Sequence, residues 1–124
     1  MAASAERISE VIHRYVELVA TGTTDEVVDL YAEGATVEDP VGSEVRTTRE
    51  SIRGFYSALE GLEQEGRVLT ARIAAGQAAF CFELATKAGE QTYTLAPIDV
   101  MTFDDDGKIT SMRAFWADSD VEVS

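Results

Sequence analysis

Residues 68–117 decide the fold class, and they read VLTARIAAGQAAFCFELATKAGEQTYTLAPIDVMTFDDDGKITSMRAFWA. Side chains that favour β-structure fill four segments of this stretch, at 68–75, 78–87, 91–104 and 108–117. Turn signals separate the segments, at Gly76, Ala88-Gly89 and Asp105-Asp106-Gly107. Connections as short as these join antiparallel neighbours, so the stretch predicts an antiparallel meander.

The residues that precede this stretch favour a helix first. Ser4 can cap a helix that Gly22 ends. Between these two residues, apolar side chains recur at helical spacing and gather on one face: Ile8, Val11, Ile12, Tyr15, Leu18 and Val19. The pattern predicts an amphipathic helix that covers the sheet.

Two shorter helices are predicted next. One opens at Thr24 and Asp25 and closes at Gly34, and its apolar face holds Val27, Val28, Leu30 and Tyr31. A short strand, ATVED, follows at residues 35–39. The last helix is expected over roughly 48–60, with one face made of Ile52, Phe55, Tyr56 and Leu59.

Helices followed by a meander are typical of the α+β class. We expect a single domain over residues 1–124, in which three N-terminal helices pack on one face of a curved, mostly antiparallel sheet. A sheet of this kind can wrap into a cone that encloses an apolar pocket.

The composition limits the partners and cofactors. A formal net charge of −13 argues against nucleic acid and anionic membranes, because both attract cationic surfaces. The single cysteine, Cys81, excludes an internal disulfide and a cysteine-rich zinc site. The single histidine, His13, argues against a histidine metal site and a Ser-His-Asp triad. The two counts therefore argue against a metal site built from cysteine or histidine ligands.

Two further patterns concern location and calcium. No stretch approaches the ~20 continuous apolar residues of a membrane span, and MAASAERISE lacks the basic start and apolar core of a signal peptide. The expected location is therefore the cytoplasm. The acidic run at residues 104–107 lacks the spaced ligands of a calcium loop, so we predict a solvated hairpin turn there.

Asp99 is a carboxylic acid in an apolar strand, QTYTLAPIDVMTF, residues 91–103. Alternation places one set of residues on a common face: Tyr93, Leu95, Pro97, Asp99, Met101 and Phe103. Desolvation among such neighbours would raise the pKa of Asp99 and favour the neutral acid. The alternative is a strand-edge aspartate that a bulge at Pro97 turns to solvent. The spacing leaves both interpretations open.

Asp39 lies directly before Pro40 in the segment VEDPVGSE, residues 37–44. Asp-Pro-x-Gly is ordinary turn chemistry, and the segment taken alone favours a turn. The second interpretation is a carboxylate fixed at the rim of a pocket, since the proline restricts Asp39 to extended backbone.

Three tyrosines fall one on each predicted helix, each within its apolar face: Tyr15, Tyr31 and Tyr56. They are either core residues with locally satisfied hydroxyls, or a network that aims one phenol proton into a pocket. Five other residues could line that pocket or belong to the plain core: Phe55, Phe82, Phe103, Met112 and Trp116.

Together, these segments resemble the bacterial ketosteroid isomerases (steroid Δ-isomerases) of the NTF2-like, SnoaL-related superfamily. The matching segments follow the family's order and cover most of the chain: RYVELVATG, LYAEGATVEDPVGSE, IRGFY, APIDVMTF and ITSMRAFW. Residues 57–76 match poorly.

The resemblance implies an NTF2-like cone, a homodimer formed through the outer sheet face, and a steroid-like apolar ligand. By the same resemblance, Asp39 would be the general base, Tyr15 a donor to the substrate oxygen, and Asp99 a second, protonated donor. The supporting hydroxyl network would be Tyr31 and Tyr56. The pocket residues would be Phe55, Phe82, Phe103, Met112 and Trp116, with Trp116 near the base.

The implied reaction converts a 3-oxo-Δ5-steroid into its 3-oxo-Δ4 isomer through a dienolate. Asp39, expected to have an ordinary pKa, would carry the proton from one carbon to the other. Tyr15 and Asp99 would stabilise the dienolate oxygen; an acid kept neutral by its apolar site is an established feature of these isomerases. The alternatives are another NTF2-like enzyme, such as a polyketide cyclase or an epoxide hydrolase, and a non-catalytic binder of an apolar ligand.

Overall fold

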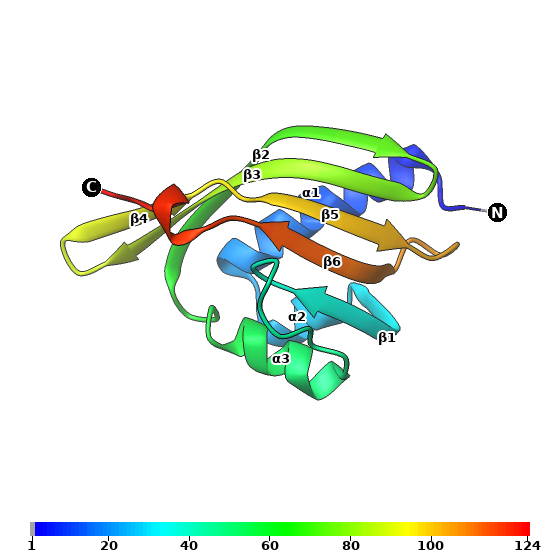
Figure 1. Cartoon of the computed structure of the whole chain (residues 1–124), viewed down its shortest axis with the longest axis horizontal. Coiled ribbons are helices and arrows are strands. Elements are labelled where there is room, and N and C mark those ends of the chain that lie inside the picture. Colours follow the sequence, from blue (N-terminus) through cyan, green and yellow to red (C-terminus); the bar gives the residue numbers. More distant parts are fainter. Residues whose placement is uncertain (1) are drawn as a thin grey trace.

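The computed structural model describes residues 2–124 and contains three α-helices and seven strands within them (Figure 1). The helices are α1 (Ala5–Thr21), α2 (Thr24–Val28) and α3 (Arg49–Ser57). The strands are β1 (Tyr31–Glu38), β2 (Glu63–Ala74), β3 (Gln77–Ala88), β4 (Gln91–Leu95), β5 (Ile98–Phe103), β6 (Ile109–Phe115) and β7 (Glu122–Val123). A short 3₁₀ helix at Asp118–Asp120 precedes β7.

The strands form one curved sheet in the order β1-β6-β5-β3-β4-β7, with β2 on the other side of β3. The pairings are antiparallel except for β1 with β6, which is parallel. Helix α1 packs against β2 and β3, whereas α3 packs against β1 and α2. The predicted α+β class with a curved, mostly antiparallel sheet is therefore confirmed. The strand β1 lies between α2 and α3 in the chain.

The first helix matches the sequence pattern. The Ser4 hydroxyl accepts a hydrogen bond from the Arg7 N–H at 3.0 Å, which caps the start of α1. Gly22 ends the helix, and its N–H donates to the Leu18 carbonyl. All six apolar residues of the predicted face are buried. Their burial fixes which side of α1 faces the sheet.

The predicted second helix is wrong beyond Val28. Helix α2 begins after the Thr23 cap and ends at Val28, and Tyr31 is the first residue of β1. The apolar spacing of this segment suits a helix, but pairing with β6 overrides it: Tyr31 is in register with Ile109, whose N–H donates to the Leu30 carbonyl at 2.9 Å. The strand predicted at 35–39 therefore begins four residues earlier, and Asp39 follows its end.

The segment predicted as one strand over 91–104 is two strands. The chain leaves the sheet at Ala96 and Pro97, so β4 pairs with the second half of β3 and β5 with the first half. Tyr93 consequently lies exposed on β4 and does not share a row with Asp99. The strand β2 begins five residues before its predicted start, because β3 pairs with it along its length.

The turns and the core follow the predicted pattern. Gly76, Gly89 and Gly107 have positive φ angles at the three predicted turns. The Asp104 carboxylate accepts hydrogen bonds from the N–H groups of Asp106 and Lys108 in the last of them, as expected for a hairpin turn. The buried core lies between the inner face of the sheet and the helices. No helix among residues 2–124 is long and apolar enough to cross a membrane.

Candidate active site

Asp39 lies at the start of a turn that is fastened to the neighbouring strand. Its peptide bond to Pro40 is cis, and the Ser43 N–H donates to the Pro40 carbonyl at 3.0 Å. The Val41 N–H donates to the Ala114 carbonyl of β6 at 2.8 Å. The turn expected from Asp-Pro-x-Gly is therefore present, and it holds Asp39 beside the end of β6.

Glu38 anchors the same turn from the opposite side of β1. One carboxylate oxygen accepts the Gly42 N–H at 2.9 Å, and the other accepts the Arg113 Nε at 3.1 Å. These bonds hold the pKa of Glu38 below its ordinary value, the bond from Gly42 being the larger cause. The alternation of β1 thus directs Glu38 and Asp39 to different environments.

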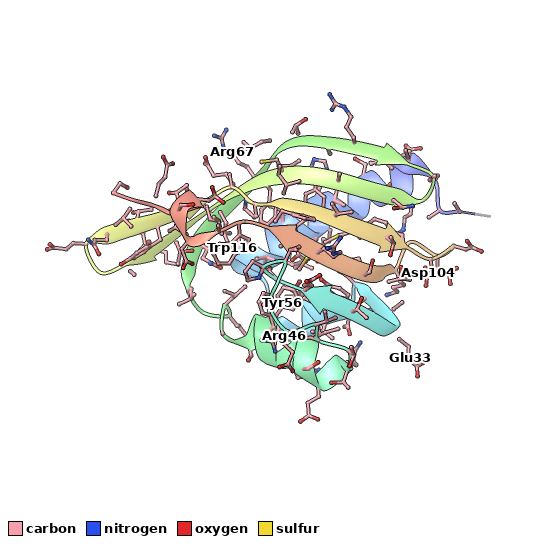
Figure 2. All side chains as sticks on the ribbon, viewed as in Figure 1. Glu33, Arg46, Tyr56, Arg67, Asp104 and Trp116 are labelled. Carbon is pink, nitrogen blue, oxygen red and sulfur yellow. The ribbon has the colours of Figure 1, made fainter. Side chains whose placement is uncertain are left out.

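The Asp39 carboxylate accepts a hydrogen bond from the Trp116 Nε1 at 2.7 Å. Burial raises the pKa of Asp39, while the Trp116 bond and the positive charge of Arg46 oppose that rise. Desolvation outweighs the two stabilising partners, so the pKa of Asp39 is raised above the ordinary value that the sequence analysis expected. Figure 2 labels Trp116 at the end of β6, with Tyr56 and Arg46 below it in the view, toward α3.

Asp99 is 1% exposed and lies on the inner face of β5. Its backbone is in register with Phe80 of β3 on one side and Ala114 of β6 on the other, so no sheet edge turns it to solvent. Its Oδ1 has no hydrogen-bond partner among the described residues. Burial, and secondarily the charge of Asp39, raise the pKa of Asp99 well above its ordinary value. Burial therefore favours the neutral form of this carboxyl group.

The three tyrosine hydroxyls form one chain of hydrogen bonds. The Tyr56 hydroxyl lies 2.7 Å from that of Tyr15 and 2.7 Å from that of Tyr31. All three residues are buried, and burial raises the pKa of each phenol well above its ordinary value. Tyr15 comes from α1 and Tyr56 from α3, whereas Tyr31 lies on β1 instead of the predicted helix. The phenols are therefore neutral donors at physiological pH.

The carboxyl groups and the tyrosine chain belong to one cluster. The charges of Asp99 and Asp39 both disfavour ionisation of Tyr15 and of Tyr31. The Tyr15 ring also meets Phe80 and Phe82 edge-on, with ring centroids 6.4 Å away in each case. The cluster thus combines a partly buried proton acceptor, Asp39, with neutral O–H groups in apolar surroundings.

The residues expected to line a pocket lie in the core or against it. Phe82 and Met112 are fully part of the core, whereas Phe55, Phe103 and Trp116 are partly buried against it. Phe55 meets the Tyr56 ring edge-on at 4.9 Å, which places it beside the hydroxyl chain.

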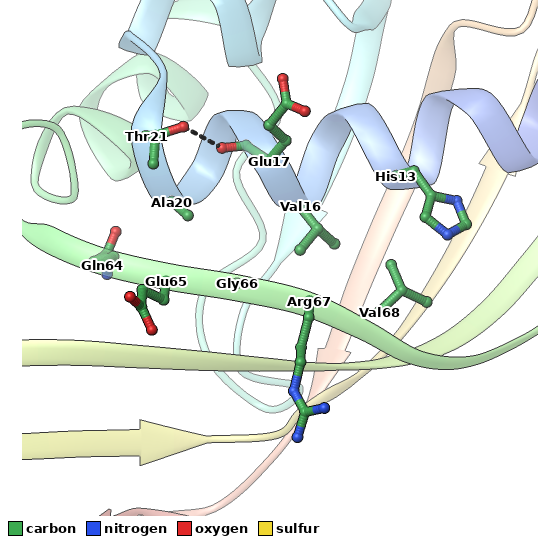
Figure 3. Close-up of a pocket in the computed structure, with 10 residues that line it drawn as sticks. All are labelled: His13, Val16, Glu17, Ala20, Thr21, Gln64, Glu65, Gly66, Arg67 and Val68. Carbon is green, nitrogen blue, oxygen red and sulfur yellow. Dashed lines mark hydrogen bonds between the residues drawn. The ribbon is translucent and has the colours of Figure 1, made fainter.

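The two largest cavities described next are not lined by those five residues. A cavity of about 500 Å³ separates α1 from β2, with His13, Glu17 and Thr21 on one side and Gln64 and Arg67 on the other (Figure 3). A second, of about 560 Å³, lies between β1 and the start of α3, and the Tyr31 side chain forms part of its wall. His13, expected to be solvated, is exposed at the first cavity.

Sequence reasoning missed Arg46 and the role of Glu38. Arg46 follows Asp39 by seven residues and lies in an irregular loop, where no periodic pattern indicates which way a side chain points. Its proximity to Asp39 depends on an isolated backbone pairing between Arg46 and Val37. Alternation along residues 37–39 already indicated that Glu38 and Asp39 point to opposite sides. Nothing in the sequence identified Arg113 as the partner of Glu38.

Nothing in this cluster resembles a metal centre. Within residues 2–124, no three His, Cys, Asp or Glu side chains are placed to hold a metal ion together. The chemistry that the cluster offers is proton transfer at Asp39 with hydrogen-bond donation from Tyr15 and Asp99.

Comparisons with known proteins identify the family of the chain. Residues 12–112 match the SnoaL-like domain family. The chain is 49% identical over 121 residues to a protein named Steroid Delta-isomerase from Nocardioides simplex, covering 98% of each chain. The solved structure of SalBIII, described as an epoxide hydrolase/cyclase-like enzyme in pyran ring formation in the polyether salinomycin, is 26% identical. It superposes with a TM-score of 0.87 over 96% of this chain and 97% of that one. The chain belongs to the SnoaL-like (NTF2-like) family and, within it, to the group that contains this steroid Δ-isomerase.

Proposed function

We propose that the protein is a cofactor-independent steroid Δ-isomerase that converts 3-oxo-Δ5-steroids to 3-oxo-Δ4-steroids through a dienolate. The observation that carries this proposal is the buried Asp99, 1% exposed and with no partner for its Oδ1 among the described residues, in one cluster with Asp39 and the phenol of Tyr15. The identity of 49% to a protein named Steroid Delta-isomerase gives the same reaction independent support.

In the proposed mechanism, Asp39 removes the proton next to the carbonyl and returns it at the far end of the allylic system. The Trp116 N–H, 2.7 Å from the carboxylate, fixes the orientation of the acceptor oxygens during both transfers. A carboxyl pKa raised by burial makes Asp39 a stronger base than a solvated aspartate, while the Trp116 hydrogen bond and the charge of Arg46 favour its ionised form.

The dienolate oxygen is stabilised by two neutral donors. Tyr15 donates its phenol proton and accepts a hydrogen bond from Tyr56, which in turn accepts one from Tyr31. Such a relay strengthens the terminal donor because each bond polarises the next. Asp99 supplies the second O–H. The apolar side chains in the core or packed against it are proposed to exclude water from the reacting atoms: Phe55, Phe82, Phe103, Met112 and Trp116.

The experiment is a direct assay with 5-androstene-3,17-dione, followed by the ultraviolet absorbance of the conjugated enone. We expect a rise in absorbance far above the spontaneous rate, with no added metal or cofactor. A rate equal to the spontaneous one, with the folded protein and soluble substrate, would rule the isomerase out.

An epoxide hydrolase is the rival within the family, since the SalBIII structure shares the fold. That chemistry requires an arginine between two carboxylates to activate water. Arg46 is the arginine whose charge reaches Asp39, but no ion pair joins Arg46 to Asp39 or Asp99 among the described residues. Burial also favours the neutral form of Asp99, which suits a donor better than a water-activating base. A non-catalytic binder would show steroid binding without turnover.

The tyrosine chain predicts an order of effects. Tyr15→Phe should lower turnover more than Tyr31→Phe or Tyr56→Phe, because only Tyr15 donates to the substrate oxygen. Removing one hydroxyl from a buried network typically costs about 1–3 kcal/mol, shared here between stability and catalysis. Turnover and thermal unfolding are measured together for the three variants. A larger loss of turnover in Tyr31→Phe than in Tyr15→Phe would reverse the proposed order.

The proposed assembly is a homodimer formed through the outer sheet face. Cys81, Ile98 and Phe115 are register partners on adjacent strands β3, β5 and β6, so they form one outward row. Ile98 is 50% and Phe115 42% exposed, which is unusual for large apolar residues in the middle of a sheet.

Phe115→Glu should therefore convert a dimer to a monomer in light scattering after size-exclusion chromatography. Two carboxylates would be brought into an apolar contact, one from each subunit. Leu62→Glu is the matched control, because Leu62 is 44% exposed but lies in the connection before β2. A wild-type monomer at micromolar concentration would contradict the proposal. The cytoplasmic location stays a prediction, which fractionation of the source cells would test.

A further inference from the structure

Arg46 is fixed in place by backbone and side-chain contacts that the catalytic assignments do not use. Its backbone pairs with Val37: the Arg46 N–H donates to the Val37 carbonyl at 2.8 Å, and the Val37 N–H donates to the Arg46 carbonyl at 3.0 Å. Val37 is fully buried in β1, two residues before Asp39. The pairing therefore anchors Arg46 to the same strand that carries the proposed base.

The guanidinium group is held by α3. Its Nη1 donates to the Ser51 carbonyl at 3.1 Å, and its Cζ lies 5.2 Å from the centre of the Phe55 ring. A guanidinium over an aromatic face is attracted by the ring's negative charge distribution, by about 0.5–1 kcal/mol at a partly exposed site. Both contacts leave the positive charge without a carboxylate partner of its own.

The charge of Arg46 acts on Asp39 at a distance. The groups that face the cluster from the other elements are Tyr15 on α1, Tyr31 on β1 and Asp99 on β5, and none of them carries a positive charge. Trp116, the residue that follows β6, contributes a neutral N–H. Arg113 is engaged by Glu38 and also lies over Phe115, on the outer face of the sheet. Arg46 is therefore the cation that opposes the desolvation of Asp39.

We infer that Arg46 is a positioning residue for Asp39, which supplies a fixed positive charge to the base while Ser51 and Phe55 keep it from forming a direct ion pair. The inference rests on the proposed role of Asp39 as base. A direct ion pair would typically lower a carboxyl pKa by about 1–3 units and weaken the base. A cation held further away still favours the ionised form of Asp39 but leaves most of its basicity.

The test removes the charge and then restores it. Arg46→Met keeps an apolar stem against Phe55 without the charge, and Arg46→Lys keeps the charge. Arg49→Gln is the control, because it also removes one arginine near the start of α3, where Arg49 pairs with Asp29. If Arg46→Met does not fold by circular dichroism, Arg46→Gln replaces it.

The first readout is the titration of the Asp39 carboxyl carbon by NMR, assigned by its absence in Asp39→Asn. We expect the pKa of Asp39 to rise by about 0.5–1 unit in Arg46→Met, to return most of the way in Arg46→Lys, and to stay unchanged in Arg49→Gln. The second readout is the pH dependence of kcat/KM. Its acidic limb should move to higher pH in Arg46→Met, with a loss of about 3- to 10-fold below the pKa and none well above it.

The outcomes separate this inference from the proposed function. An unmoved Asp39 titration in Arg46→Met would overturn the role of Arg46 even in an active isomerase. A loss of activity that is equal at all pH values would also overturn it, since that pattern indicates a structural role. Absence of isomerase activity in the wild-type protein would refute the proposed function, while the NMR titration would still test the coupling between Arg46 and Asp39.

Discussion

Asp39→Asn should lower turnover by at least about 10²–10⁴-fold while leaving steroid binding intact. The amide has nearly the shape of the carboxylate, and its oxygen can still accept the hydrogen bond from Trp116 that holds the side chain at 2.7 Å. It cannot accept the substrate proton. The loss should therefore appear in kcat, with little change in the dissociation constant of a bound steroid.

Two measurements support this test. Quenching of the fluorescence of Trp116, the single tryptophan, by a phenolic steroid such as estradiol reports binding in both proteins. Asp29→Asn serves as the control, since Asp29 is an exposed carboxylate whose partner is Arg49; it should keep wild-type turnover. Near-normal turnover in Asp39→Asn would mean that another group is the base.

The turn at Asp39 explains why the two interpretations of VEDPVGSE are compatible. The bonds from Val41 to β6 and from Gly42 to Glu38 fix the backbone on both sides of the base. A catalytic carboxylate must hold its position within a fraction of an ångström, and a turn fastened to two strands provides that. The common turn motif thus provides the rigid support that the proposed reaction needs.

The sequence predicted the parts of the fold that depend on local pattern. The cap at Ser4, the apolar face of α1 and the glycine turns follow from rules that act over a few residues. The inward direction of Asp99 follows from alternation within β5 alone, even though the longer strand assumed around it was wrong. This inference requires only that Asp99, Met101 and Phe103 lie on the same face of one strand, which β5 provides.

The parts that could not be predicted depend on pairing between distant segments. Tyr31 has helical spacing with Val27 and Val28, and only the parallel contact of β1 with β6 makes it a strand residue. The strand β2 begins in the polar run 63–66 because β3 supplies hydrogen bonds there. Arg46 reaches Asp39 through one isolated pairing with Val37. These contacts join residues whose local sequence has no preference for them.

The surroundings of the two carboxyl groups support the different roles that we propose for them. Burial is the largest influence on both, and it raises both pKa values. Asp39 receives a hydrogen bond from Trp116 and the field of Arg46, which favour its ionised form. Asp99 receives neither, and the charge of Asp39 makes its ionisation still less favourable. Environments that push two pKa values apart identify the acid and the base of a pair.

The raised pKa of Asp99 also leads to a prediction about the pH dependence of stability. A carboxyl group whose pKa is raised on folding binds more protons in the native state than in the unfolded one. Stability is therefore lost as pH rises from the ordinary aspartate pKa, near ~4, towards the raised native value. Asp99→Asn cannot ionise, so it should gain thermal stability relative to the wild type as the pH is raised from about 5 to 8. Equal pH dependence in the two proteins would indicate an ordinary pKa.

Asp99→Ala should lower turnover by roughly 10²–10³-fold, the usual cost of removing one oxyanion donor. Asp99→Asn keeps an N–H that can donate, so its loss should be smaller. The Oδ1 atom of Asp99 has no partner among the described residues, so its hydrogen-bonding capacity is available to a substrate oxygen. Turnover of the two variants with 5-androstene-3,17-dione is compared with that of Ser111→Ala, a change on the outer side of β6. If Asp99→Asn lost as much activity as Asp99→Ala, the role of Asp99 would require a carboxyl group and could not be hydrogen-bond donation alone. If the Asp99 carboxyl carbon titrated near the ordinary aspartate pKa, the donor role would be excluded. A charged Asp99 would repel the dienolate that it is proposed to stabilise.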